Sequence, residues 1–169
     1  MELDLTFSSI DAANVAQIDA LAQLTYEAFK VHAPSWLTNK NEAERRVLQA
    51  TESGRLNRVL IDAKAQPIGW IGVIPVNHGR IWEIHPLVVS SVMQKRGYGR
   101  MLVTEVARLA KSHGVLGLLA GTSDETGATS LFQIDLYVDP LTAMAALTGT
   151  ENHPVAFWMR LGFKVVGIL

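Results

Sequence analysis

The sequence contains no cysteine. This excludes disulfide bonds, thiolate-bound metals and a cysteine-linked covalent intermediate. A basic surplus is also missing, because 15 Lys and Arg stand against 16 Asp and Glu and the formal net charge is −1. Proteins that bind nucleic acid through its phosphates need such a surplus, so we expect no nucleic-acid partner.

Long apolar runs and a basic N-terminal signal are absent from the sequence. No apolar stretch approaches the roughly 20 residues of a transmembrane helix, and residues 1–4 are acidic. We therefore expect no membrane partner and a cytoplasmic protein. With 169 residues, 49% hydrophobic and 18% charged, the composition excludes disorder and predicts one globular domain over residues 1–169.

Hydrophobic periodicity predicts strands alternating with helices. A first helix is expected from a cap at Ser9 or Asp11 to about Val31. The other expected helices cover 39–51, 97–113, 141–147 and 154–161, and the expected strands cover 3–10, 57–62, 67–76, 81–89, 115–122 and 164–169. This order predicts an α/β or α+β fold, a sheet with helices on its faces.

Two glycines, Gly97 and Gly99, stand where the strand 81–89 gives way to the helix 97–113. The first amides of a helix have no intrahelical partner and favour anions, and glycine lets a phosphate approach the backbone. Lys95, Arg96 and Arg100 add positive charge. Two glycines alone are equally compatible with a tight strand–helix turn.

The full pattern Gln-x-x-Gly-x-Gly from Gln94 to Gly99 resembles motif A of the GNAT N-acetyltransferase superfamily. The late helix ending in Leu161-Gly162-Phe163 resembles the corresponding helix of that family. The resemblance implies a mixed, mostly antiparallel central sheet flanked by helices, and acetyl-CoA as co-substrate. It implies contacts to the pantetheine arm by Leu87, Val88 and Val89. Two residues near the late helix, Asn152 and Trp158, are also predicted to bind the cofactor. The pyrophosphate is expected to be bound by Gln94, Lys95, Arg96, Gly97, Tyr98, Gly99 and Arg100.

A narrower resemblance rests on the segments 81–89, 121–125 and 135–137, which look like a bacterial branch labelled aminoglycoside 6'-N-acetyltransferase-like. That label is a substrate hypothesis. Charge supports it, because residues 114–159 carry no Lys or Arg but five acids, among them Asp124, Glu125 and Asp135. These three are predicted to bind a polycationic amine; the alternative is a solvated acidic loop, in which Asp139 before Pro140 caps a turn.

Acetylation of an amine needs a base, because alkylamines are protonated near pH 7. Glu83 and His85 are two residues apart on one strand, so they share a face. Glu83 also lies eleven residues before Gln94, the spacing of the catalytic glutamate in the histone-acetylating branch of the family. Glu83 is therefore the predicted base and His85 a participant; the alternatives are a solvated glutamate and a core histidine.

The amide of Leu87 maps to the family's donor to the thioester oxygen, and it follows Pro86, which has no N–H. With no cysteine, direct transfer is favoured over an acetyl-enzyme. The five histidines lack metal-ligand spacing, so no metal is expected.

Two features depart from the family pattern. Trp158 occupies the position where many family members carry a tyrosine that can protonate the departing thiolate. Either the thiolate leaves unprotonated or through water, or another group such as Tyr137 substitutes. The alternative for Trp158 itself is plain core packing. The family usually adds one strand after 164–169. Either the chain is truncated, or a partner or neighbouring strand covers the open edge. A homodimer is the expected assembly.

Together with the resemblance, these residues predict an acetyl-CoA-dependent N-acetyltransferase that acts on a primary amine of a small polycationic acceptor, either aminoglycoside-like or a polyamine. Two rivals remain open. One is an acetyltransferase for a peptide N-terminus or protein lysine, and the other is a catalytically silent acyl-CoA-binding module.

Overall fold

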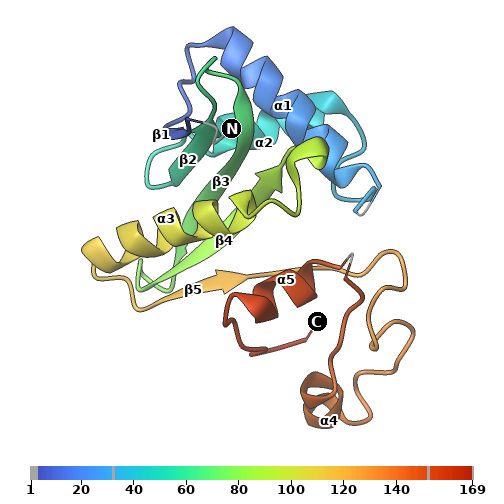
Figure 1. Ribbon diagram of the computed structural model, residues 1–169. Helices are drawn as coiled ribbons and strands as arrows, with labels where there is room; N and C mark the ends of the chain where they lie inside the picture. Colours follow the sequence, from blue (N-terminus) through green and yellow to red (C-terminus); the bar gives the residue numbers. More distant parts are fainter. Residues whose placement is uncertain (1–3, 32, 152, 169) are drawn as a thin grey trace. The chain divides into compact units, whose positions relative to one another are not determined.

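The computed structural model describes residues 4–31, 33–151 and 153–168. They fall into two compact units, Met1–Gly121 and Thr122–Leu169, whose elements Figure 1 labels. The first unit holds a five-stranded sheet in the order β1-β2-β3-β4-β5. The strands are β1 (Thr6–Ser8), β2 (Leu56–Ile61), β3 (Pro67–Val76), β4 (Ile81–Val89) and β5 (Gly117–Ala120). All neighbours are antiparallel except β4 and β5, which confirms the mixed, mostly antiparallel sheet.

The hairpin between β3 and β4 lies where the sequence predicts it. Asn77 and His78 have φ of 49° and 56°, and Gly79 N donates to the oxygen of Val76 at 3.0 Å. Residues at positive φ match the twist of the flanking strands, so this short turn sets where both strands end. The bounds of β3 and β4 are those expected from the sequence.

Helix α1 (Val15–Phe29) begins later than expected, and its cap is Asn14. The Asn14 side chain accepts from the amide of Gln17 at 3.0 Å. Asp11 instead accepts from Ala13 N at 2.9 Å, in a turn that precedes the helix. The predicted cap at Ser9 or Asp11 is therefore wrong, because three turn-forming residues compete there and only Asn14 reaches the first-turn amides.

Helices α1 and α2 (Lys40–Gln49) cover one face of the sheet. The core on this face surrounds Trp70, whose side chain is fully buried. The indole N–H of Trp70 donates to Thr25 Oγ1 at 2.8 Å, and that hydroxyl donates to the oxygen of Leu21 at 2.7 Å. Both buried polar groups are thus satisfied. The cluster contains Ile10, Ile18, Leu21, Val47, Ala50, Val59, Trp70 and Val88.

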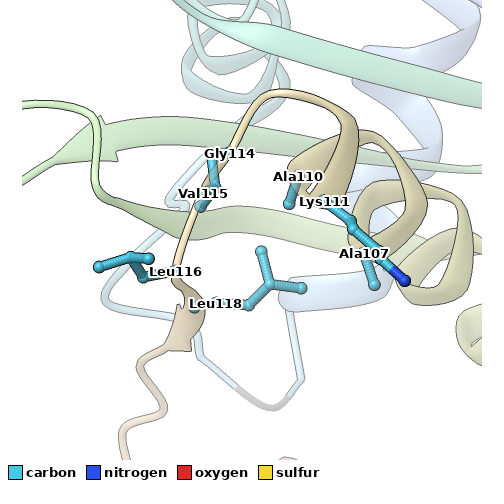
Figure 2. A pocket seen from close by; sticks show the side chains of 8 residues that line it. Ala107, Ala110, Lys111, Gly114, Val115, Leu116 and Leu118 are labelled. Carbon is cyan, nitrogen blue, oxygen red and sulfur yellow. The ribbon is translucent and has the colours of Figure 1, made fainter.

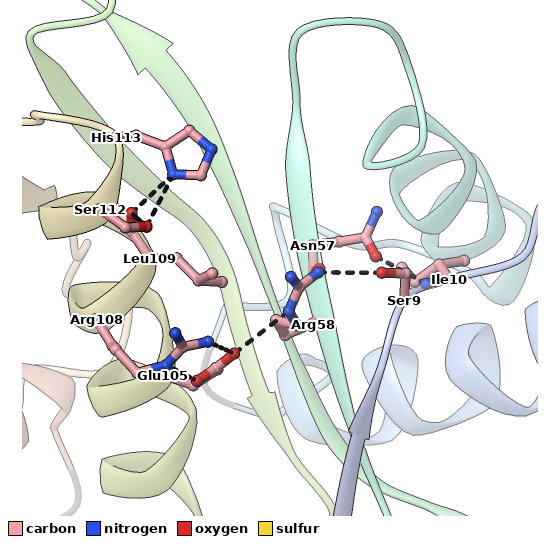
Figure 3. Close-up of polar contacts among 9 residues, drawn as sticks. All are labelled: Ser9, Ile10, Asn57, Arg58, Glu105, Arg108, Leu109, Ser112 and His113. Atoms are coloured by element: carbon pink, nitrogen blue, oxygen red, sulfur yellow. Dashed lines mark hydrogen bonds and ion pairs between the residues drawn. The ribbon is translucent and has the colours of Figure 1, made fainter.

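The opposite face carries α3 (Tyr98–Ser112). Figure 3 shows the sheet between α3 and the α1–α2 pair. Glu105 of α3 joins Arg108 at 2.8 Å and reaches Arg58 of β2 at 3.5 Å. Arg58 also donates to Ser9 Oγ at 3.0 Å, so one polar network ties α3 to the sheet and to the N-terminal segment.

The second unit contains α4 (Pro140–Ala145), α5 (Pro154–Arg160) and an isolated bridge between Thr129 and Gly149. The ring of buried His153 accepts from Val155 N at 3.2 Å and contacts the oxygen of Ser123 at 3.1 Å. Asp139 caps α4 by accepting from Thr142 N at 3.1 Å, the turn-capping role considered for it from the sequence.

The last expected strand, 164–169, is not formed over the described residues 164–168, which carry no strand assignment. An alternating pattern favours an extended backbone, but a strand exists only when a neighbour supplies hydrogen-bond partners. None of the described helices is long and apolar enough to cross a membrane.

Candidate active site

Strand β4 contains a bulge at the residues expected to do the chemistry. Ile71 of β3 lies opposite Leu87, yet Val73 lies opposite Ile84, so β4 holds one residue more than β3 over this stretch. The extra residue falls at His85–Pro86, whose peptide bond is cis. A bulge of this kind re-aims the side chains beyond it.

The bulge changes which face each side chain occupies. His85 and Val88, three residues apart, would face opposite sides on a regular strand. Here the His85 ring contacts Trp36, in the segment between α1 and α2, and Val88 packs in the cluster around Trp70. Both therefore face the helices α1 and α2, whereas alternation places Leu87 on the other face.

Glu83 and His85 are both half-buried and lie on the same face, as the spacing predicts. Burial lowers the pKa of the His85 imidazole, against the opposing effect of the Glu83 carboxylate. The guanidinium groups of Arg46 and Arg55 lower the pKa of His85 further. This shift favours the neutral imidazole, which is the form able to accept a proton.

The far edge of β4 pairs with β5 over only part of its length. The parallel register runs from Ile81 opposite Gly117 to Ile84 opposite Ala120, where β5 ends. Leu87, Val88 and Val89 continue β4 beyond that point. Their edge backbone groups are not used by β5, so an extended ligand with amide groups could bind there as an added strand.

The loop after β4 leads directly into α3. Gln94 Nε2 donates to the oxygen of Val89 at 3.2 Å, and Gly97 is the N-cap of α3 with φ of 91°. The first bond within the helix runs from Met101 N to the oxygen of Gly97 at 3.0 Å. The amides of Tyr98, Gly99 and Arg100 precede it, so they have no partner inside the helix and point toward the loop.

This loop fits an anionic ligand such as the pyrophosphate of coenzyme A. A Cβ built on Gly97 would meet no atom within 4 Å, so space lies above the backbone there. Lys95, Arg96 and Arg100 are all exposed around it. Open backbone amides, a helix N-terminus and three cations together attract phosphate groups.

The three predicted acceptor-binding carboxylates lie in the second unit and differ from one another. Asp124 accepts from the amides of Thr126, Ala128 and Thr129 and from the Thr129 hydroxyl. Although burial acts in the opposite direction, these hydrogen bonds hold the pKa of Asp124 well below its usual value. Asp124 thus organises its own loop.

Asp135 is exposed and accepts one bond, from Tyr137 N at 3.0 Å, and Glu125 is half-buried. Trp158 is buried and packs between Phe157 and Phe163, with ring centroids 4.9 and 5.0 Å apart. Asn152, expected to bind cofactor, lies outside the described residues. Among the described residues, no group of three or more His, Asp or Glu could hold a metal ion.

A surface hollow of about 380 Å³, shown in Figure 2, lies at the opposite end of α3. A helix of 15 residues extends about 22 Å, so this hollow is far from the glycine loop. It is lined by Ala107, Ala110, Lys111, Gly114, Val115, Leu116, Gly117 and Leu118. It is therefore separate from the predicted phosphate site.

Sequence reasoning missed two residues of this region. A Cβ on Gly72 would lie 2.7 Å from the backbone oxygen of His85, so only glycine allows β3 to approach the bulge. A glycine inside a predicted strand was the available signal. Trp36 was missed because it lies 49 residues from His85, in a segment that the periodicity leaves between two helices.

Comparisons with known proteins identify the family of this chain. Residues 17–136 match the family described as the acetyltransferase (GNAT) family. An aminoglycoside 6'-N-acetyltransferase solved with coenzyme A is 31% identical, with a TM-score of 0.84, over 97% of this chain and 87% of that one. The aminoglycoside 6'-N-acetyltransferase from Enterococcus faecium is 30% identical, with a TM-score of 0.81 over the same shares. A search of curated proteins found no significant match.

Proposed function

Since this chain belongs to the acetyltransferase (GNAT) family and is an acetyl-CoA-dependent acyltransferase, we propose that it acetylates a primary amine of a small polycationic acceptor of the aminoglycoside kind. The observation that carries the acceptor class is the likeness to two aminoglycoside 6'-N-acetyltransferases over nearly the whole chain. The exposed carboxylate of Asp135, in a stretch without Lys or Arg, supports a cationic acceptor.

The co-substrate is proposed to lie along the edge of β4 and the start of α3. Leu87, Val88 and Val89 would contact the pantetheine arm through their backbone edge, and the amides from Gln94 to Arg100 would hold the pyrophosphate. Acetyl-CoA supplies an activated acetyl group as a thioester. The amide of Leu87, directly after the bulge, would donate to the thioester oxygen as negative charge develops on it.

Glu83, with His85 beside it, would remove a proton from the acceptor ammonium group, directly or through water. The neutral amine then forms the new C–N bond while the C–S bond breaks, and the acetylated nitrogen releases its second proton to water, so that the product is a neutral amide. The sulfur leaves with its bonding electrons and takes a proton from water. Trp158 does not supply that proton, because an indole N–H is not acidic in this range.

We propose that residues 1–169 act as one N-acetyltransferase domain. The family match from 17 to 136 extends across the boundary between the two compact units, which supports a joint role for both. We also propose that the chain forms a homodimer. Sedimentation of the purified chain at two concentrations tests it, and a monomer at both would contradict it.

A thiol-release assay with acetyl-CoA tests the function. The panel pairs an aminoglycoside that bears a 6'-amino group with its 6'-hydroxy counterpart, and adds a linear polyamine, a monoamine and a peptide with a free N-terminus. We expect the 6'-amino compound to give the highest kcat/KM. Preference for the peptide would favour the protein-acetylating rival, and acetyl-CoA binding without turnover on any amine would favour the silent module.

A further inference from the structure

Trp36 makes three ring contacts that join separate elements of the first unit. Its ring centroid is 4.4 Å from that of Phe29 at the end of α1 and 5.5 Å from that of His85 on β4. The guanidinium carbon of Arg46, on α2, lies 5.3 Å above the same ring. One side chain therefore links both helices to the histidine of the candidate site.

Core packing accounts for only part of this arrangement. Trp36 packs against a small buried cluster of Ala22, Leu37 and Ala43. Its contact with His85 is of another kind, since the two ring planes are 88° apart in an edge-to-face geometry. Such a pair fixes the direction of both rings, because the edge of one must meet the face of the other.

We propose that Trp36 is a positioning residue for His85 in acetyl transfer, holding the imidazole on the face that carries Glu83 and keeping the Arg46 guanidinium beside it. The proposal rests on the proposed function, in which Glu83 and His85 handle the proton of the acceptor amine. It adds a residue from the α1–α2 segment that acts through His85.

Two physical effects would follow from this position. The edge-to-face contact restricts rotation of the imidazole, so one ring nitrogen keeps a constant direction. The Trp36 face also holds a guanidinium through a cation–π contact, and that positive charge disfavours a second one on the imidazole. The charged groups acting on His85 are Glu83 on β4, Arg46 on α2 and Arg55 after α2.

The sign of each effect can be measured by NMR titration of the His85 ring without substrate, with the resonance assigned from a His85→Gln variant. Arg46→Gln removes a nearby positive charge, so the pKa of His85 should rise. Glu83→Gln removes the negative charge, so it should fall. Arg45→Gln is the matched control, because Arg45 is its neighbour on α2 but is exposed and paired with Glu42 at 3.3 Å. It should leave the titration of His85 unchanged.

Variants of Trp36 test the positioning itself. Trp36→Ala should raise the pKa of His85 and reduce kcat more at pH 6.5 than at pH 8.5, because a protonated imidazole cannot accept a proton. The loss of kcat should stay below roughly 100-fold, which is the lower limit expected when a general base is removed. Trp36→Phe keeps an aromatic ring and should restore most of the activity and the titration.

Three results would overturn the proposal: an unchanged His85 titration in Trp36→Ala with folding retained by circular dichroism, equal loss of kcat at both pH values, or equal effects of Arg45→Gln and Arg46→Gln. The NMR titration does not depend on turnover. If the wild-type protein acetylates no amine while the titrations shift as expected, the proposed function fails and the placement of Trp36 stands.

Discussion

Gln94 donates its side-chain amide to the backbone oxygen of Val89 at 3.2 Å. The glutamine of the Gln-x-x-Gly-x-Gly segment thereby closes the loop back onto the end of β4. The bond joins the two stretches proposed to hold the two halves of coenzyme A, the strand edge and the glycine loop.

We expect Gln94→Ala to loosen this loop and to raise the KM for acetyl-CoA by roughly 2- to 10-fold, the range for loss of one neutral hydrogen bond. The Gln66→Ala variant is the control, because Gln66 makes a comparable exposed bond to the oxygen of Lys64 at 3.5 Å in a distant turn. Steady-state kinetics of both variants compare them. A KM change in Gln66→Ala equal to that in Gln94→Ala would contradict the role of the loop.

Gly97 offers a sharper test of the phosphate site. Gly97→Val should abolish acetyl-CoA binding, because a branched side chain at φ of 91° is strained and would fill the space above the loop amides. Gly114→Val is the matched control at the other end of α3, with φ of 70° and equally open surroundings. Both should lose on the order of 1–2 kcal/mol of stability or more.

Calorimetry with acetyl-CoA separates the two effects of these substitutions. Only Gly97→Val should lose binding, while both variants should show a lower thermal midpoint. Normal acetyl-CoA affinity in Gly97→Val would show that the loop does not hold the pyrophosphate.

Glu83→Gln should keep the affinity for acetyl-CoA but lose turnover by roughly 10²–10⁴-fold, as expected when a general base is removed. The loss should shrink at high pH, where the free amine forms without help. Glu44→Gln removes the same charge from an exposed position on α2 and should have little effect. A pH–rate profile of Glu83→Gln parallel to that of the wild type would leave His85 as the next base to test.

Asp124 and Asp135 should respond differently to the same substitution. Asp135→Asn should raise the KM for polyamines more than for monoamines, with a difference that falls as salt rises. Asp124→Asn should chiefly lower stability, because its carboxylate accepts four hydrogen bonds in its own loop. Kinetics at two ionic strengths and thermal denaturation distinguish the two. Equal KM changes for both classes of amine in Asp135→Asn would favour a solvated acidic loop.

The pH dependence of the Asp124 loop follows from the lowered pKa of that carboxyl. Stability contributed by a carboxylate with a lowered pKa is present above its ordinary value of 3.8 and is lost as pH falls below it. We expect the amide resonances of Ala128 and Thr129 to titrate with a midpoint below 3.8. A midpoint at or above that value would show that the four bonds do not favour the ionised form.

Local signals in the sequence were enough to predict the strands and the long helix that frame the site. The turn residues Asn77, His78 and Gly79 set the ends of β3 and β4, and Gly97 and Gly114 flank α3, because turns and caps depend on a few adjacent residues. The spacing of Glu83 and His85 predicted their shared face for the same reason, since alternation along a strand is a local property.

Contacts between distant segments decided the rest. The bulge in β4 depends on the approach of Gly72, and the setting of His85 depends on Trp36 and Arg46. The expected strand at 164–169 failed over its described residues because pairing needs a neighbour that no local pattern supplies. The sequence by itself determined which residue types line β4 and its glycine loop. Only the tertiary structure decided which of them are in contact. Packing brings together residues that are far apart along the chain, and such contacts produce no periodic pattern in the sequence.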